Sequence, residues 1–146
     1  MATQFITIML RAHYSEPRVV SADEFVTPLR INQDDPVVKV IRHGKGPRQA
    51  SQIVFLEAEI EQYGAPHDPD ANEHLYSDIA STFEQLAKWL NSRPIDIFET
   101  MQQSGIKLDI FIGMGIDSDQ LDLYLPPSFL LACGRRNLRI EIISND

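Results

Sequence analysis

The sequence predicts a single α+β domain with a mainly antiparallel sheet and helices packed on one of its faces. Three observations support this fold class. Several segments of strand length alternate apolar and polar residues, one long segment carries apolar residues at helical spacing, and a loop rich in glycine joins two of the strands. The 146 residues are 43% hydrophobic and 23% charged, with no repeat or linker, so one domain is expected over residues 1–146.

Alternation predicts the strands. In residues 5–14 the apolar side chains fall on one face of a pleated strand and polar residues such as Arg11 on the other. Further strands are expected at 37–42, 53–60, 106–112 and 138–142. The loop between the strands at 37–42 and 53–60 predicts a hairpin.

Capping patterns and proline predict the helices. Ser21 and Glu24 have the capping-box spacing, which indicates a short helix over 22–29. Asp70 and Glu73 repeat the pattern, with Asp70 as the cap of a long helix that begins near residue 71. Its apolar stripe consists of Leu75, Ile79, Phe83, Leu86 and Leu90. Pro94 separates it from a further helix that ends at Gly105.

The C-terminal third gives the clearest pattern. Residues 121–125 alternate and are expected to be extended, and Pro126 and Pro127 begin a short helix over 128–133. Gly134 is expected to adopt the left-handed conformation just past the end of that helix. The strand at 138–142 closes the domain.

Charge and composition restrict the class of protein. The formal net charge of −8 disfavours binding to nucleic acid or to anionic membranes and permits a basic protein partner. No apolar run approaches the ~20 residues of a membrane span, and the N-terminus lacks a secretory pattern, so a cytoplasmic location is expected. The single Cys133 cannot form an internal disulfide, which agrees with a reducing compartment.

One short segment holds residue types that bind metals. His67, Asp70, Glu73 and His74 offer two imidazoles and two carboxylates, and Asp70 and His74 lie one helical turn apart. The segment therefore suggests, as an alternative, a small metal-dependent or small-molecule-binding enzyme. Capping already explains Asp70 and Glu73, so no cofactor is the primary expectation.

An acidic stretch motivates the leading hypothesis. Residues 57–78 contain no Lys or Arg, and Glu57, Glu59, Glu61 and Asp68 are the candidate partner-binding residues. Such a stretch would accelerate association with a cationic partner. We therefore expect a non-enzymatic protein-binding module, an antitoxin-like or immunity-type partner of a basic protein, or a homodimer.

Catalytic motifs do not favour an enzyme. The sequence has no Gly-x-Ser-x-Gly, His-Glu-x-x-His or Gly-x-Gly-x-x-Gly pattern. Cys133, in a short apolar helix, is expected to be an inert small hydrophobe. The basic residues of 39–48 are expected to be exposed hairpin charges that protect a sheet edge, with a partner-facing patch as the alternative.

With these elements in place, the chain resembles a mostly bacterial family known as domain of unknown function 4279. The resemblance rests on the segment from Ser21 to Leu29, the long helix through Leu86 and Leu90, and the ending from Leu121 to Ile142. The Ile53–Leu56 run stands where the family has a tryptophan. The resemblance implies a fold and no activity, because the family has no established catalytic residues to transfer.

Overall fold

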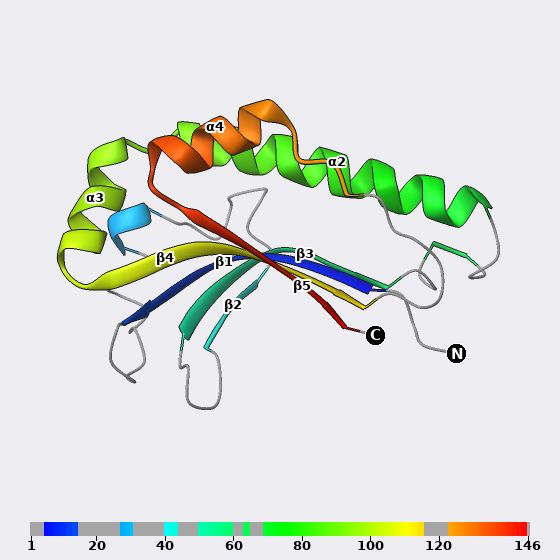
Figure 1. The fold of residues 1–146 in the computed structure, drawn as a ribbon, viewed down its shortest axis with the longest axis horizontal. Coiled ribbons are helices and arrows are strands. Elements are labelled where there is room, and N and C mark those ends of the chain that lie inside the picture. The colour runs from blue at the N-terminus through cyan, green and yellow to red at the C-terminus, as the bar shows by residue number, and fades with distance from the viewer. Residues whose placement is uncertain are drawn as a thin grey trace.

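A computed structural model describes residues 5–14, 27–30, 40–43, 50–59, 63–64, 69–115 and 123–145. Its strands form a five-stranded sheet in the order β2-β3-β1-β4-β5. The labelled helices all lie on one face of this sheet (Figure 1). The predicted α+β class with a mainly antiparallel sheet is therefore confirmed.

The sheet is built around its first strand. The strands are β1 (Phe5–Tyr14), β2 (Val40–His43), β3 (Ala50–Glu59), β4 (Ile106–Gly115) and β5 (Arg139–Asn145). β1 pairs antiparallel with β3 and β4, and β2 pairs antiparallel with β3, as the hairpin pattern predicts. β5 is parallel to β4, because the chain crosses over through a helix between them.

β4 continues three residues past the predicted end at residue 112. Gly113 and Gly115 pair with β1 and keep the ladder intact. A Cβ atom at Gly113 would come within 2.9 Å of the Phe111 ring, and one at Gly115 would overlap the Phe5 ring. At both glycines an aromatic ring thus occupies the space that a Cβ atom would take, and neither glycine ends the strand.

The helices are α2 (Pro69–Asn91), α3 (Ile95–Gln103) and α4 (Pro127–Arg135). The predicted apolar stripe of α2 is buried in the core. There the ring centres of Phe83 and Phe129 lie 4.8 Å apart. α2 begins at Pro69, so Asp70 lies inside the first turn and the expectation that it caps the helix is wrong. None of the described helices has the length and apolar character needed to cross a membrane.

The end of α4 also differs from the prediction. The helix continues to Arg135, so Gly134 lies within its last turn, and Asn137 takes the left-handed conformation, with φ of 53°. The N–H of Leu138 donates to the carbonyl of Cys133 at 2.9 Å, and that of Asn137 to Gly134 at 3.2 Å. This is a Schellman ending with asparagine in the place of glycine. The segment at 121–125 was expected to be extended, and its described part, residues 123–125, joins no strand among those described.

A buried arginine joins the helix ends. Arg136 donates to the carbonyl of Ala132 at 3.1 Å, to the side chain of Asn91 at 3.3 Å and to the carbonyl of Arg93 at 3.1 Å. Arg93 in turn donates to the carbonyl of Leu29 at 2.9 Å, which fixes the helical turn at residues 27–29. The rest of the predicted helix at 22–29 lies outside the described residues. These arginines complement the negative ends of α2 and α4.

Candidate functional site

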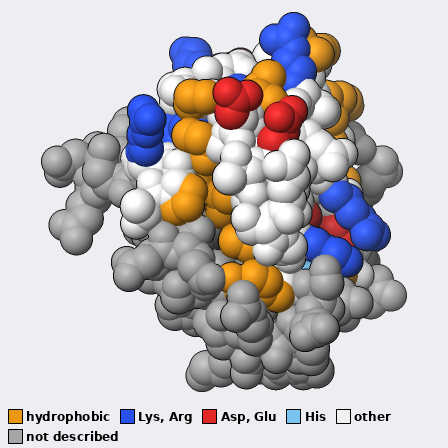
Figure 2. Space-filling model, turned by 90° about the vertical axis from the view of Figure 1, so that its left-hand side faces the viewer, with side chains coloured by type: hydrophobic (Ala, Val, Ile, Leu, Met, Phe, Trp, Pro, Cys, Tyr) orange, Lys and Arg blue, Asp and Glu red, His pale blue; other side chains and the backbone are white. Residues whose placement is uncertain are grey.

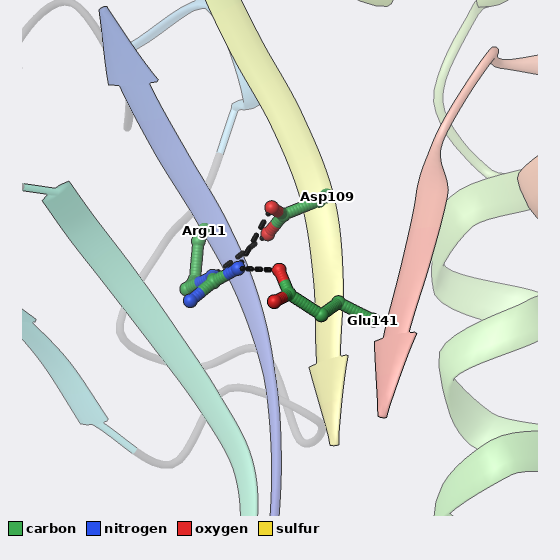
Figure 3. Close-up of polar contacts among 3 residues, drawn as sticks. All are labelled: Arg11, Asp109 and Glu141. Atoms are coloured by element: carbon green, nitrogen blue, oxygen red, sulfur yellow. Dashed lines mark hydrogen bonds and ion pairs between the residues drawn. The ribbon is translucent and has the colours of Figure 1, made fainter. Parts of the chain in front are cut away.

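The face of the sheet opposite the helices carries a charged cluster. Side-chain alternation turns Arg11 of β1 and Asp109 of β4 to this open face, and the two residues are direct cross-strand partners. Glu141 of β5 shares the face, because it is paired with Phe111. Three strands therefore meet at one guanidinium group (Figure 3).

The geometry of this cluster is specific. Arg11 donates from Nε and Nη2 to the two carboxylate oxygens of Asp109, both at 2.8 Å, and from Nη2 to Glu141 at 2.8 Å. Its guanidinium lies 4.4 Å from the centre of the Phe111 ring. Burial lowers the pKa of Arg11, but the hydrogen bonds and charges of both carboxylates outweigh it, so the pKa is raised overall.

These contacts suit a structural clamp better than proton transfer. Arg11 stays protonated at any physiological pH, and both oxygens of Asp109 accept hydrogen bonds from it. The sequence did not predict that these three residues form a cluster. The signal was present, because each of the three apolar strands contains charged residues, but only the strand order brings Arg11, Asp109 and Glu141 together.

The predicted metal-binding segment is described in part. Asp70, Glu73 and His74 are exposed near the start of α2, and His67 lies outside the described residues. Within the described ranges, no three His, Cys, Asp or Glu side chains are grouped so that they could hold a metal ion. The set of four including His67 stays a prediction.

The acidic residues are divided between two layers. Glu57 and Glu59 are exposed on β3 and face the open side of the sheet. Their partners on β1, Thr7 and Phe5, alternate with residues that point into the core. Asp70, Glu73 and Asp78 lie on α2, across the sheet. Glu61 and Asp68 lie outside the described residues. The described acidic side chains therefore do not form one continuous surface.

Two neighbouring pockets open at the α3 end of the molecule. The first, which we call the apolar pocket, has a volume of about 520 Å³ and lies between α3, the end of β1 and the turn at 27–30. Its walls include Ile97, Met101 and Ile106, and Asp96 lies on its rim. Figure 2 shows hydrophobic side chains in a band across this end of the molecule, with basic side chains on both sides of the band.

The second, which we call the basic pocket, has a volume of about 430 Å³. Lys107 and Arg139 line it together with Asp109, and the amides of Gln102 and Asn137 lie on its α3 and α4 sides. β5 begins opposite Asp109, so the preceding residues of β4 have a free edge there among the described strands. Neither Lys107 nor Arg139 forms an ion pair with a described residue.

The outer edge of β5 and the adjacent helix α4 form an exposed apolar margin. Within the described part of the chain, no strand pairs with the outer edge of β5. Large apolar side chains are exposed along it: Ile142 at 47% and Ile143 at 40% on β5, and Leu130 at 44% and Leu131 at 54% on α4. We call these four residues the β5–α4 margin. α4 and β5 lie on the same side of the molecule and contact each other (Figure 1).

The single cysteine is not available for chemistry. Cys133 belongs to α4 and lies on the buried side of that helix. Burial raises its pKa to about 12, against the smaller opposing effect of the Arg136 charge. The thiol is therefore protonated at neutral pH, as expected for an inert core residue.

The chain matches no family model, no curated protein and no solved structure in the three comparisons made. The resemblance to domain of unknown function 4279 therefore stays a prediction.

Proposed function

We propose that the protein is a non-enzymatic protein-binding module whose binding surface is the β5–α4 margin, and that a second copy of the chain occupies it. One observation supports the proposal above the others. The outer edge of β5 is unpaired among the described strands and is flanked by exposed apolar side chains. Unpaired strand edges are templates for pairing with another chain.

The distribution of these side chains favours a partner strand of the same sequence. Ile142 is paired with Ile112 and lies on the helix-covered face, whereas Ile143 is paired with Gly113 and lies on the open face. An antiparallel β5 from a second copy would extend an apolar row on both faces of the sheet. A two-fold axis at this edge would also bring Leu130 and Leu131 of both α4 helices into the same interface. Such a contact is self-complementary, as a two-fold dimer requires.

Net charge distinguishes this partner from a basic protein. Each copy carries a formal charge of −8, so two copies repel each other at long range, and salt should strengthen their association. The acidic-surface hypothesis requires the opposite, because salt weakens binding between an acidic and a basic protein. Arg135 and Arg139 are exposed on α4 and β5, which makes the margin itself an unsuitable surface for a cationic partner.

The chemistry of the described residues also favours binding over catalysis. The carboxylates of Asp109 and Glu141 are engaged by Arg11 in ion pairs. The only thiol is buried and protonated. We therefore assign the exposed margin, and not the charged cluster, to the function.

Light scattering after size-exclusion chromatography tests the proposal. The wild-type chain should show twice its monomer mass of 16.6 kDa, with the dimer favoured by higher salt. Ile142→Lys and Leu131→Lys should give monomers. Ile95→Lys is the matched control, since Ile95 is 36% exposed but lies on α3. A monomeric wild type, or a dimer unaffected by Ile142→Lys, would refute the second copy. If the protein instead captures a basic protein that salt releases, the dimer proposal is wrong and the acidic-surface hypothesis takes its place.

A further inference from the structure

We propose that the basic pocket is a binding site for a small organic phosphate, whose dianionic phosphoryl group is held between Lys107 and Arg139. Lys107 lies two residues before Asp109 on β4, and Arg139 is paired with Asp109 across β4 and β5. All three residues therefore belong to the face of the sheet that carries Arg11. The site does not use the outer edge of β5, so it goes beyond the proposed dimer and does not depend on it.

The pocket exists because β4 begins before β5 lies beside it. The first parallel pair joins Asp109 to Arg139, and residues 106–108 precede this pair without a partner on β5. The residues before Arg139 lead back to α4, so a cavity of about 430 Å³ is left between the start of β4 and the α4–β5 turn. This volume lies within the range of about 300–1,000 Å³ typical of small-ligand sites.

Two cations of this pocket are available for a ligand. Lys107 and Arg139 are exposed and form no ion pair with a described residue, although Asp109 lines the same pocket. The reason is that both carboxylate oxygens of Asp109 accept hydrogen bonds from Arg11 at 2.8 Å (Figure 3). Glu141 also binds Arg11 and does not line the pocket. An anionic ligand would therefore supply the counter-charge that these carboxylates do not.

The spacing of the two cations suits one phosphoryl group. They lie on neighbouring strands and are offset by two residues, so sheet geometry places their Cα atoms roughly 8 Å apart. Long side chains can converge on one group from this distance. The guanidinium of Arg139 can donate two parallel N–H groups to two phosphate oxygens, and the ammonium of Lys107 adds a point charge. A small dianion matches both charges, whereas the net charge of −8 repels a polyanion at long range.

The remaining walls of the pocket are preorganised and partly apolar. The Nε2 of Gln102 donates to the carbonyl of Arg136 at 3.0 Å and to that of Asn137 at 3.4 Å, which ties α3 to the α4–β5 turn. A fixed wall lowers the entropic cost of binding. Three buried apolar residues also line the pocket, namely Ile106, Leu108 and Leu138. They offer a surface for the organic part of a phosphate ester.

Titration of ¹⁵N-labelled full-length protein with phenyl phosphate, near neutral pH and at low salt, tests the proposal. We expect saturable binding with Kd of about 0.1–1 mM, and amide shifts concentrated at the start of β4 and in the α4–β5 turn. Lys107→Gln and Arg139→Gln should each raise Kd about tenfold, because each removes one charge-assisted contact. Benzoate, which carries one negative charge, should bind about tenfold more weakly than phenyl phosphate.

Lys88→Gln is the matched control, because Lys88 is an exposed cation on α2, outside the pocket, and should leave Kd unchanged. Each variant should keep the wild-type thermal midpoint, since none of these cations forms an ion pair with a described residue. Non-saturable shifts would overturn the proposal, as would binding that Lys107→Gln and Arg139→Gln leave unchanged. Benzoate that binds as tightly as phenyl phosphate would overturn the preference for a dianion, and equally tight inorganic phosphate would overturn the organic ligand.

Discussion

The two faces of the sheet are stabilised in different ways. The face under the helices is an apolar layer in which the central side chains are fully buried, namely Ile6, Ile8, Leu10, Ile110 and Ile112. On the open face Met9 and Val54 are buried, and the same face carries the polar cluster at Arg11. The covered face depends on the area removed from water, and the open face depends on hydrogen-bond geometry at one side chain.

The covered face contributes mainly to the stability of the fold, and the open face contributes mainly to the specificity of the strand arrangement. Packing of an apolar layer tolerates changes that conserve volume, because it has no directional contacts. A guanidinium that joins three strands tolerates few substitutions, because only one arrangement of β1, β4 and β5 satisfies it. We infer that the cluster fixes the position of β5, which in turn places both the margin and the basic pocket.

The largest effect should come from the covered face. Phe83→Ala removes a fully buried ring from the contact with Phe129 and should lower the free energy of unfolding by about 3–5 kcal/mol. Urea denaturation measures this loss. Glu84→Ala, at the next and exposed position of α2, should change stability by less than about 0.5 kcal/mol. A cost below about 1 kcal/mol for Phe83→Ala would show that the helices are not packed as described.

The open face should be less costly to disturb but strongly coupled. Arg11→Met leaves the carboxylate of Asp109, whose side chain is 8% exposed, without its partner and should cost about 2–3 kcal/mol. Asp109→Asn should cost a similar amount, and the double variant should cost less than the sum. Urea denaturation of the four proteins gives the coupling energy.

Arg139→Met is the control for this cycle. Arg139 lies on β5 beside the cluster and pairs in the ladder with Asp109, but Asp109 forms its ion pair with Arg11. Its loss should change stability by less than about 0.5 kcal/mol. Additive effects of Arg11→Met and Asp109→Asn would mean that the open face is not held by their contact.

The sequence predicted the covered face well because periodicity records which side chains are buried. The alternation in residues 5–14 and 106–112, and the stripe from Leu75 to Leu90, all correspond to the observed core. The errors lie at element ends. Asp70 and Gly134 have residue types typical of caps, but Pro69 starts α2 earlier, and Asn137 can adopt the left-handed conformation that ends α4 later.

The open face could not be predicted from one sequence. Asp109 lies 98 residues after Arg11 in the sequence, and Glu141 lies 130 residues after it. No local pattern shows that β4 lies between β1 and β5. The same lack of strand order made the acidic stretch at 57–78 resemble a single surface. The fold places its described members on opposite layers, because β3 and α2 belong to different layers.

The smallest expected effect concerns the buried thiol on the helix-covered side. The folded chain raises the pKa of Cys133 to about 12, from an ordinary value of 9.0, so the thiol stays protonated where the unfolded chain would ionise. Its contribution to stability is fully present below pH 9 and is lost as pH rises toward 12. At pH 10 the loss should be about 1 kcal/mol.

Comparison of the wild type with Cys133→Ala isolates this effect, because both proteins keep Tyr63, whose pKa is also raised to about 12 by burial and by its hydrogen bond to Asp78. Between pH 8 and pH 10 the wild type should lose more stability than the variant. Parallel pH profiles would mean that Cys133 ionises in the folded chain. That result would also contradict the dry packing of α4 on which the contrast between the two sides of the sheet depends.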